Sequence, residues 1–118
     1  MGKQELEKIL WEIKNKSNDS IILVEGKRDE EALTKAGIPD YSIIQVSYKN
    51  NNQIYNEVIS YNKKRVIALY DNDRTGRMKL SNIKAFFAGL GIQFLDYKKA
   101  LERAGITYIE EIDNRLGI

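Results

Sequence analysis

Three acidic residues stand directly after apolar runs of the sequence, where their carboxylates could hold a divalent cation. Glu25 follows the run Ile21–Val24, and Asp71 and Asp73 follow a second run that ends at Tyr70. Aspartates two positions apart on an extended chain point to the same side. Carboxylates about 4 Å apart repel by roughly 1 kcal/mol in water, and by about 4 kcal/mol at an effective dielectric of 20. A cation would remove that penalty, so the three acids predict a metal site.

The residue types narrow the choice of metal. The sequence contains no cysteine and no histidine, which excludes thiolate and imidazole ligands. A site made only of oxygen ligands suits Mg²⁺, with Mn²⁺ as a substitute, rather than zinc. Magnesium usually keeps several waters and completes its shell with substrate phosphates. We therefore expect Mg²⁺ at Asp71, Asp73 and Glu25, facing a phosphate.

Glycines and basic residues flank the acids and predict contacts to phosphate. Gly26 and Gly76 permit close backbone approach, so N–H groups at helix N-termini could face a phosphate, although tight strand-to-helix turns explain them equally well. Asp29 lies in the first turn of its helix, where it stabilises the dipole or supports the metal ligands. The basic side chains expected to bind phosphates are Lys27, Arg28, Arg74 and Arg77, with Lys79 in the same cluster.

A parallel sheet is needed to bring these residues together. Apolar runs of strand length alternate with segments of helical periodicity, which predicts βαβ units. Strands are expected over 21–24, 42–47, 65–70 and 92–95. Helices are expected over 4–16, 28–36, 53–61, 76–89 and 98–103, with a last one started by a capping box of Thr107 and Glu110. Trp11 is expected in the core, and residues 49–53 are expected to form a flexible loop.

The expected order of these strands follows from right-handed crossovers. If the second strand lies outside the first, the third becomes the first strand's other neighbour and the order is 2-1-3-4. Ligands of open α/β sheets bind beyond the carboxyl ends of the strands, where the order reverses. The predicted fold is α/β, with three α/β/α layers around a mostly parallel four-stranded sheet. Its switch point places Glu25 beside Asp71 and Asp73.

Composition and length bound the class of protein. The 118 residues are 42% hydrophobic and 31% charged, typical of one globular domain over 1–118, with the helix 4–16 preceding a core of about 20–118. No apolar run approaches the roughly 20 residues of a membrane span, and Glu5 and Glu7 argue against a signal peptide. A cytoplasmic protein with no membrane contact is expected. The net charge of +2 shows no basic excess, so local patches must decide phosphate binding.

Two stretches of the sequence resemble the signatures of the Toprim domain. Ile21–Asp29 reads IILVEGKRD and Val66–Gly76 reads VIALYDNDRTG. They match a strand-end glutamate followed by glycine, and a strand-end Asp-x-Asp, in that order. The resemblance covers nearly the whole chain and is closest to small stand-alone Toprim proteins and to the Toprim part of the ribosomal-RNA maturation nuclease. It implies that Asp71 and Asp73 bind Mg²⁺ and that Glu25 is the general acid or base.

The resemblance implies magnesium-dependent phosphodiester chemistry on RNA or DNA, as in a small nuclease of RNA processing or DNA repair. Primase and topoisomerase activities are not expected, because the additional domains of those enzymes have no counterpart in the sequence. The alternative is a non-catalytic module that binds nucleic acid or a protein partner in a larger complex, or as a homo-oligomer. The stretch 71–75 also fits the nucleophile pattern of haloacid-dehalogenase-like phosphatases and the start of a calcium loop. Its place on the third strand disfavours the phosphatase, and Asn82 at the twelfth loop position disfavours the calcium loop.

Overall fold

Four parallel strands form the central layer of the structure, a computed structural model that describes residues 2–118. Their order is β2-β1-β3-β4, and every neighbouring pair is parallel. The predicted α/β class and the predicted 2-1-3-4 order are therefore confirmed. Val24 pairs with Leu69, so the central strands end level with each other. The bounds are β1 Ser20–Val24, β2 Ile43–Gln45, β3 Arg65–Leu69 and β4 Gln93–Asp96.

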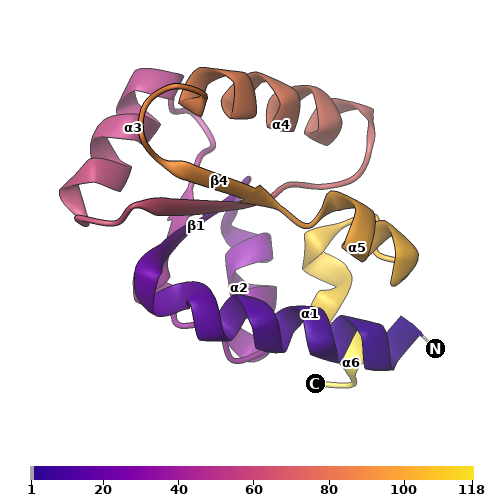
Figure 1. The fold of residues 1–118 in the computed structure, drawn as a ribbon. Helices are drawn as coiled ribbons and strands as arrows, with labels where there is room; N and C mark the ends of the chain where they lie inside the picture. The colour runs from indigo at the N-terminus through magenta and orange to yellow at the C-terminus, as the bar shows by residue number, and fades with distance from the viewer. Residues whose placement is uncertain (1) are drawn as a thin grey trace.

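Helices cover both faces of this sheet and complete the three layers (Figure 1). One face carries α3 (Asn51–Ser60) and α4 (Arg74–Phe87). The other face carries α1 (Gly2–Lys16), α2 (Lys27–Lys35), α5 (Lys98–Arg103) and α6 (Ile112–Leu116). Short 3₁₀ turns are η1 (Ser17–Asp19), η2 (Asp40–Ser42) and η3 (Ile109–Glu111). No helix within residues 2–118 is both long and apolar enough to cross a membrane.

The central strands bury side chains on both faces, which explains why they read as continuous apolar runs. In β1, Ile22 and Val24 pack into the core under α1 and α2, whereas Ile21 and Leu23 pack into the core under α3 and α4. All four side chains are fully buried. Because the side chains alternate along one strand, the two cores are joined through the sheet.

Two local predictions are wrong, one for residues 49–53 and one for Trp11. Residues 49–53 do not form one flexible loop, because α3 begins at Asn51 and is capped by Asn50 and Gln53 in a reciprocal capping box. Trp11 is 66% exposed rather than in the core. The core face of α1 is formed by residues at helical spacing, and Trp11 lies about 100° away from its neighbour Leu10 on the helix.

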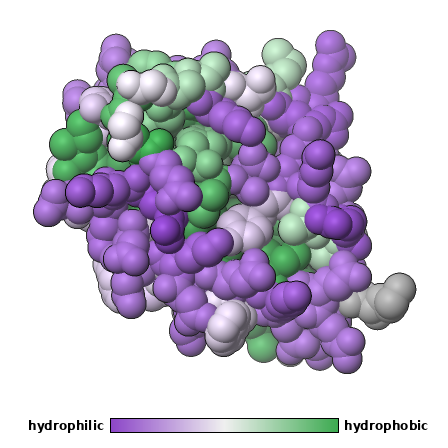
Figure 2. All heavy atoms as spheres, in the orientation of Figure 1, coloured by the Kyte–Doolittle hydropathy of each residue, from purple (hydrophilic) through white to green (hydrophobic). Residues whose placement is uncertain are grey.

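On the face drawn in Figure 2, the largest group of surface hydrophobic side chains lies at one corner. Figure 2 shows them gathered where the chain turns from α4 into β4. Phe86 packs edge-on against Tyr55 and against Phe87, with ring centroids 6.3 and 5.8 Å apart. This aromatic cluster closes the α3–α4 core and lies at the far end of α4 from Asp73.

Candidate metal and nucleic-acid site

Glu25 and Asp71 meet at the carboxyl ends of β1 and β3, the point at which the strand order reverses. Glu25 Oε1 accepts a hydrogen bond from the Asp71 N–H at 2.9 Å. Glu25 Oε2 forms an ion pair with Lys79 Nζ of α4 at 3.3 Å. The predicted convergence of these two acids is thus present, and both oxygens of Glu25 have partners.

The Asp71 carboxylate is held from the other side by the C-terminal part of the chain. Asp71 Oδ1 accepts a hydrogen bond from the Ile109 N–H of η3 at 2.9 Å. The next residue, Asn72, donates its N–H to the Thr107 carbonyl at 2.6 Å. The segment 107–109 therefore fixes the loop that follows β3.

Burial and neighbouring acids raise the pKa of the Asp71 carboxyl group. Burial has the largest effect, and the hydrogen bond from the Ile109 N–H opposes it. The charges that raise this pKa further belong to Glu25, Asp73 and Glu110. A carboxylate in such surroundings gains from a nearby cation.

Asp73 begins α4 as its N-cap residue. Its Oδ1 accepts a hydrogen bond from the Gly76 N–H at 2.7 Å. Gly76 is buried, and a Cβ atom on it would lie 1.9 Å from the Asp71 carbonyl oxygen. Only glycine fits there, so Gly76 sets how closely α4 approaches the loop of Asp71 and Asp73.

Asp29 is the most deeply buried acid of the cluster, at 7% exposure. Its Oδ2 accepts a hydrogen bond from the Gly26 N–H at 3.2 Å, at the start of α2. Burial, followed by the charge of Asp71, raises its pKa from 3.8 to about 6, with smaller contributions from Glu25 and Glu110. Asp29 is therefore a helix-start acid near enough to the other carboxylates to feel their charges, and its support of metal ligands stays a prediction.

The sequence leaves two readings open for the N–H groups of Gly26 and Gly76, contact with a phosphate or a place in tight strand-to-helix turns. In the structure these two N–H groups donate hydrogen bonds to Asp29 and Asp73. A phosphate there would have to displace a neighbouring carboxylate. Gly26 also has ordinary space for a Cβ atom, whose nearest contact would be Ser47 Oγ at 3.8 Å.

The predicted basic residues do not form one group. Arg77 donates to the Asn72 carbonyl at 3.0 Å, which supports the β3–α4 loop. Arg28 lines a separate hollow with Glu110 and Asp113. The remaining two predicted side chains are exposed and make no ion pair within residues 2–118; they are Lys27 and Arg74.

Sequence reasoning missed what the C-terminal segment contributes to the site. Glu110 adds a negative charge near Asp29 and Asp71, and Ile109 adds the N–H described above. The spacing of Thr107 and Glu110 was interpreted as a capping box instead. No capping side chain is bonded at η3 or α6. Nothing in the local sequence signals that this segment lies against β3, because that contact is tertiary.

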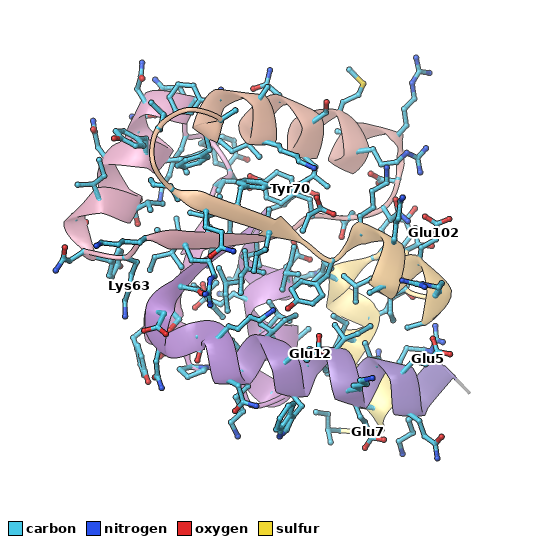
Figure 3. All side chains as sticks on the ribbon, viewed as in Figure 1. Glu5, Glu7, Glu12, Lys63, Tyr70 and Glu102 are labelled. Carbon is cyan, nitrogen blue, oxygen red and sulfur yellow. The ribbon has the colours of Figure 1, made fainter. Side chains whose placement is uncertain are left out.

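Side chains of α5 and of the end of β3 complete the surroundings of the acidic residues. The Asn72 amide donates to Glu102 of α5 at 3.2 Å. Tyr70 lies between the sheet and α4, whereas Glu102 lies on the α5 side (Figure 3). Burial, followed by the charge of Glu25, raises the pKa of the Tyr70 hydroxyl above its ordinary value.

The acids can be tested for their fit to magnesium. No hydrogen bond within residues 2–118 engages the second carboxylate oxygen of Asp71 or of Asp73. Over the same residues, no three acidic side chains are placed to enclose an ion on their own. Magnesium is usually held by one or two carboxylates together with waters and substrate phosphates. The donor set therefore fits an open magnesium site and not a closed cage.

Fold and site define a parallel α/β protein whose acidic residues gather at the switch point of the sheet. A curated relative, UPF0292 protein MJ1624 of Methanocaldococcus jannaschii, is 36% identical over 90 residues. The match spans 76% of this chain and 70% of the relative. The chain belongs to the UPF0292 family.

One solved structure supports the same fold. A protein of Aquifex aeolicus superposes with a TM-score of 0.80 and 29% identity, over 89% of this chain and 95% of that chain. The zinc-binding and RNA polymerase domains of the Aquifex aeolicus primase give a TM-score of 0.49 and 21% identity, over 92% of this chain and 27% of that one. The second likeness is too weak to bear on function. No family model matches the chain.

Proposed function

We propose that the protein is a Toprim-type, magnesium-dependent nuclease that acts on a nucleic-acid phosphodiester. The observation that carries the proposal is the contact between Glu25 and Asp71, which joins acids from two neighbouring strands at the switch point. The two acids lie 46 residues apart in the sequence, one in each of the two Toprim-like signatures. Acids brought together from such a distance, and partly buried, need a reason beyond solvation.

The side chains have distinct roles in this proposal. The free oxygens of Asp71 and Asp73 would hold Mg²⁺, which when bound supplies Lewis-acid stabilisation of the phosphate. Lys79 holds the Glu25 carboxylate in place by the 3.3 Å ion pair. Glu25 would take or give the proton of the attacking or leaving oxygen, once that hydrogen-bonding is rearranged around the substrate.

Phosphate binding would rely on side chains rather than on backbone N–H groups. Lys27 and Arg74 are exposed at the starts of α2 and α4, beside the acids. In this proposal they would contact phosphates flanking the one at the metal. Cytoplasmic action on RNA or DNA belongs to the same proposal.

Cleavage assays test the enzyme proposal directly. Structured RNA, single-stranded DNA and duplex DNA would be incubated with wild type, Glu25→Gln and Asp71→Asn, in Mg²⁺, in Mn²⁺ and in EDTA. We expect metal-dependent cleavage by wild type and a loss of at least 100-fold in both variants. Asp40→Asn, an exposed acid on η2 at the other end of the sheet, is the control and should cleave like wild type.

A metal-binding measurement separates the site from the reaction. Titration with Mn²⁺, followed by electron paramagnetic resonance, should give one site in wild type and in Glu25→Gln, and a much weaker one in Asp71→Asn. Equal binding by wild type and Asp71→Asn would overturn the metal assignment. Binding of metal without cleavage of any substrate would overturn the nuclease and leave a binding module.

The binding module is the second candidate, and one observation favours it. Both oxygens of Glu25 are engaged, by the Asp71 N–H and by Lys79, as expected of a residue that stabilises the fold. In that case the protein would hold nucleic acid or a partner without cutting. Glu25→Gln would then lower the stability and leave the affinity for nucleic acid unchanged.

A further inference from the structure

A groove of about 370 Å³ adjoins the acid cluster on the α3–α4 side of the sheet. Glu25 and Lys79 form the end that faces the acids, and the floor is apolar, with Ile54, Tyr70 and Ile83. This volume lies at the low end of small-molecule sites, so the groove suits one nucleotide and not a double helix.

Tyr48 stands at the rim of this groove in an unusual conformation. Its φ is 65°, in the left-handed region, which costs a residue other than glycine about 1–2 kcal/mol. Its side chain is fully exposed. Strain of this kind persists only where neighbours fix the backbone, and it collects at ligand sites.

The neighbours of Tyr48 fix it relative to Glu25. The Ser47 N–H donates to the Glu25 carbonyl at 3.1 Å, and the Ser47 hydroxyl donates to the same oxygen. On the other side, the Lys49 N–H donates to the Val46 carbonyl at 3.0 Å. The aromatic ring is therefore presented from a backbone anchored to the strand end that carries Glu25.

Polar groups on the far wall complement the apolar floor. Asn51 of α3 donates its amide to Asn82 Oδ1 of α4 at 2.9 Å. This bond leaves both N–H donors of the Asn82 side chain and the side-chain carbonyl of Asn51 uncommitted, the two kinds of group that pair with the edge of a base. Met78, 65% exposed, adds another apolar side chain to the lining of the groove.

We propose that this groove binds the base of one unpaired nucleotide, next to the phosphate that the acid cluster holds; the inference rests on the proposed function and deepens it. The ring of Tyr48 stacks on the base, the asparagine pair contacts its edge, and Lys79 lies towards its phosphate. A base inside a duplex is stacked on both sides and cannot enter. The substrate class is single-stranded or locally unpaired nucleic acid.

Anisotropy with short labelled oligonucleotides tests the groove. The ligands are a single strand, the same sequence as a duplex, and a single strand in which one central nucleotide is abasic, each in Mg²⁺ and in EDTA. We expect wild type to bind the intact strand at least tenfold more tightly than the other two. Tyr48→Ala should lose about tenfold for the intact strand and little for the abasic one, the loss of one stacked base.

Two further variants make the result specific. Tyr48→Phe keeps the ring and should bind like wild type, and Tyr41→Ala removes another exposed tyrosine, on η2, without effect. Thermal melts check that all variants fold. Equal binding of intact and abasic strands, or equal loss in Tyr41→Ala, would overturn the groove, as would a dimer in ultracentrifugation that Tyr48→Ala abolishes.

The outcomes also separate the groove from the proposed function. Base-dependent binding that persists in EDTA and in Asp71→Asn would support the groove. It would also show that the metal does not contribute to the affinity for the strand. Metal-dependent binding that ignores Tyr48 and the base would overturn the groove and leave the phosphate site. Absence of binding to every strand would overturn both.

Discussion

At the scale of single residues, Gly76 is the position where one added carbon matters most. Its Cβ would lie 1.9 Å from the Asp71 carbonyl oxygen, so Gly76→Ala must push α4 away from the metal-binding loop. We expect a loss of about 2–4 kcal/mol of stability. Urea unfolding would measure it. Gly26→Ala, where only an ordinary 3.8 Å contact arises, is the matched control and should lose about 1 kcal/mol or less.

The raised pKa of Asp29 predicts in which direction the stability of the folded protein changes with pH. Its pKa is raised to about 6 in the folded protein, so the folded state holds its proton more tightly than the unfolded state does. Without metal, stability should fall as pH rises from about 4 to about 6 and then stay level, by on the order of 2–3 kcal/mol.

The variant Asp29→Asn keeps an oxygen for the Gly26 N–H and removes the charge. It should be more stable than wild type above pH 6 and equal to it below pH 4. Thermal melts across this range in EDTA would show the difference. The same change at the exposed Asp40 should leave the wild-type slope in place. Asp71, whose pKa is also raised, keeps a smaller slope in Asp29→Asn, so a slope as steep as that of wild type would contradict the assignment.

At the scale of elements, η3 contacts the site through the Ile109 N–H, and a substitution can remove this one group. Ile109→Pro removes the N–H that bonds Asp71, at a position preceded by extended backbone and so compatible with proline. Ile109→Val leaves the same number of side-chain carbons as proline and keeps the N–H. We expect Ile109→Pro to be less stable than Ile109→Val by about 1–3 kcal/mol, the cost of a lost hydrogen bond to a partly buried carboxylate. Equal midpoints in urea would contradict it.

Elements also show where sequence reasoning works. Alternating apolar runs and helical periods gave the strands and helices in their places, because local pattern and burial agree there. At Thr107 and Glu110 the local sequence pattern and the structure disagree. Tyr108 between them is extended, since Asn72 takes the Thr107 carbonyl and Asp71 takes the Ile109 N–H. A tertiary contact therefore replaced the local capping box, and no single sequence reveals such a contact.

The candidate site divides in the same way. The meeting of Glu25 with Asp71 followed from strand order alone and could be predicted. The bonding of the glycine N–H groups to Asp29 and Asp73 depends on side-chain rotamers and could not. The groove beside Tyr48 depends on how α3 and α4 sit on the sheet, which periodicity does not fix.

At the scale of the whole molecule, a ligand that binds only the folded state stabilises it by mass action. If Mg²⁺ binds at Asp71 and Asp73, saturating metal should raise the melting temperature of wild type at pH 7.5 by several degrees. It should leave Asp71→Asn unchanged. Scanning calorimetry with and without EDTA measures this, with Asp40→Asn as the control expected to follow wild type. An equal rise in all three proteins would point to nonspecific ion effects.

Trp11 gives the molecule an optical property that follows from its place. It is the single tryptophan of the chain, exposed on α1 beside Ile118, on the opposite side of the sheet from the groove at Tyr48. Its emission therefore stays constant when a ligand occupies the groove. Any ligand or partner that shifts this emission is touching the α1 face or loosening it, so one unmodified fluorophore tells the two sides of the sheet apart.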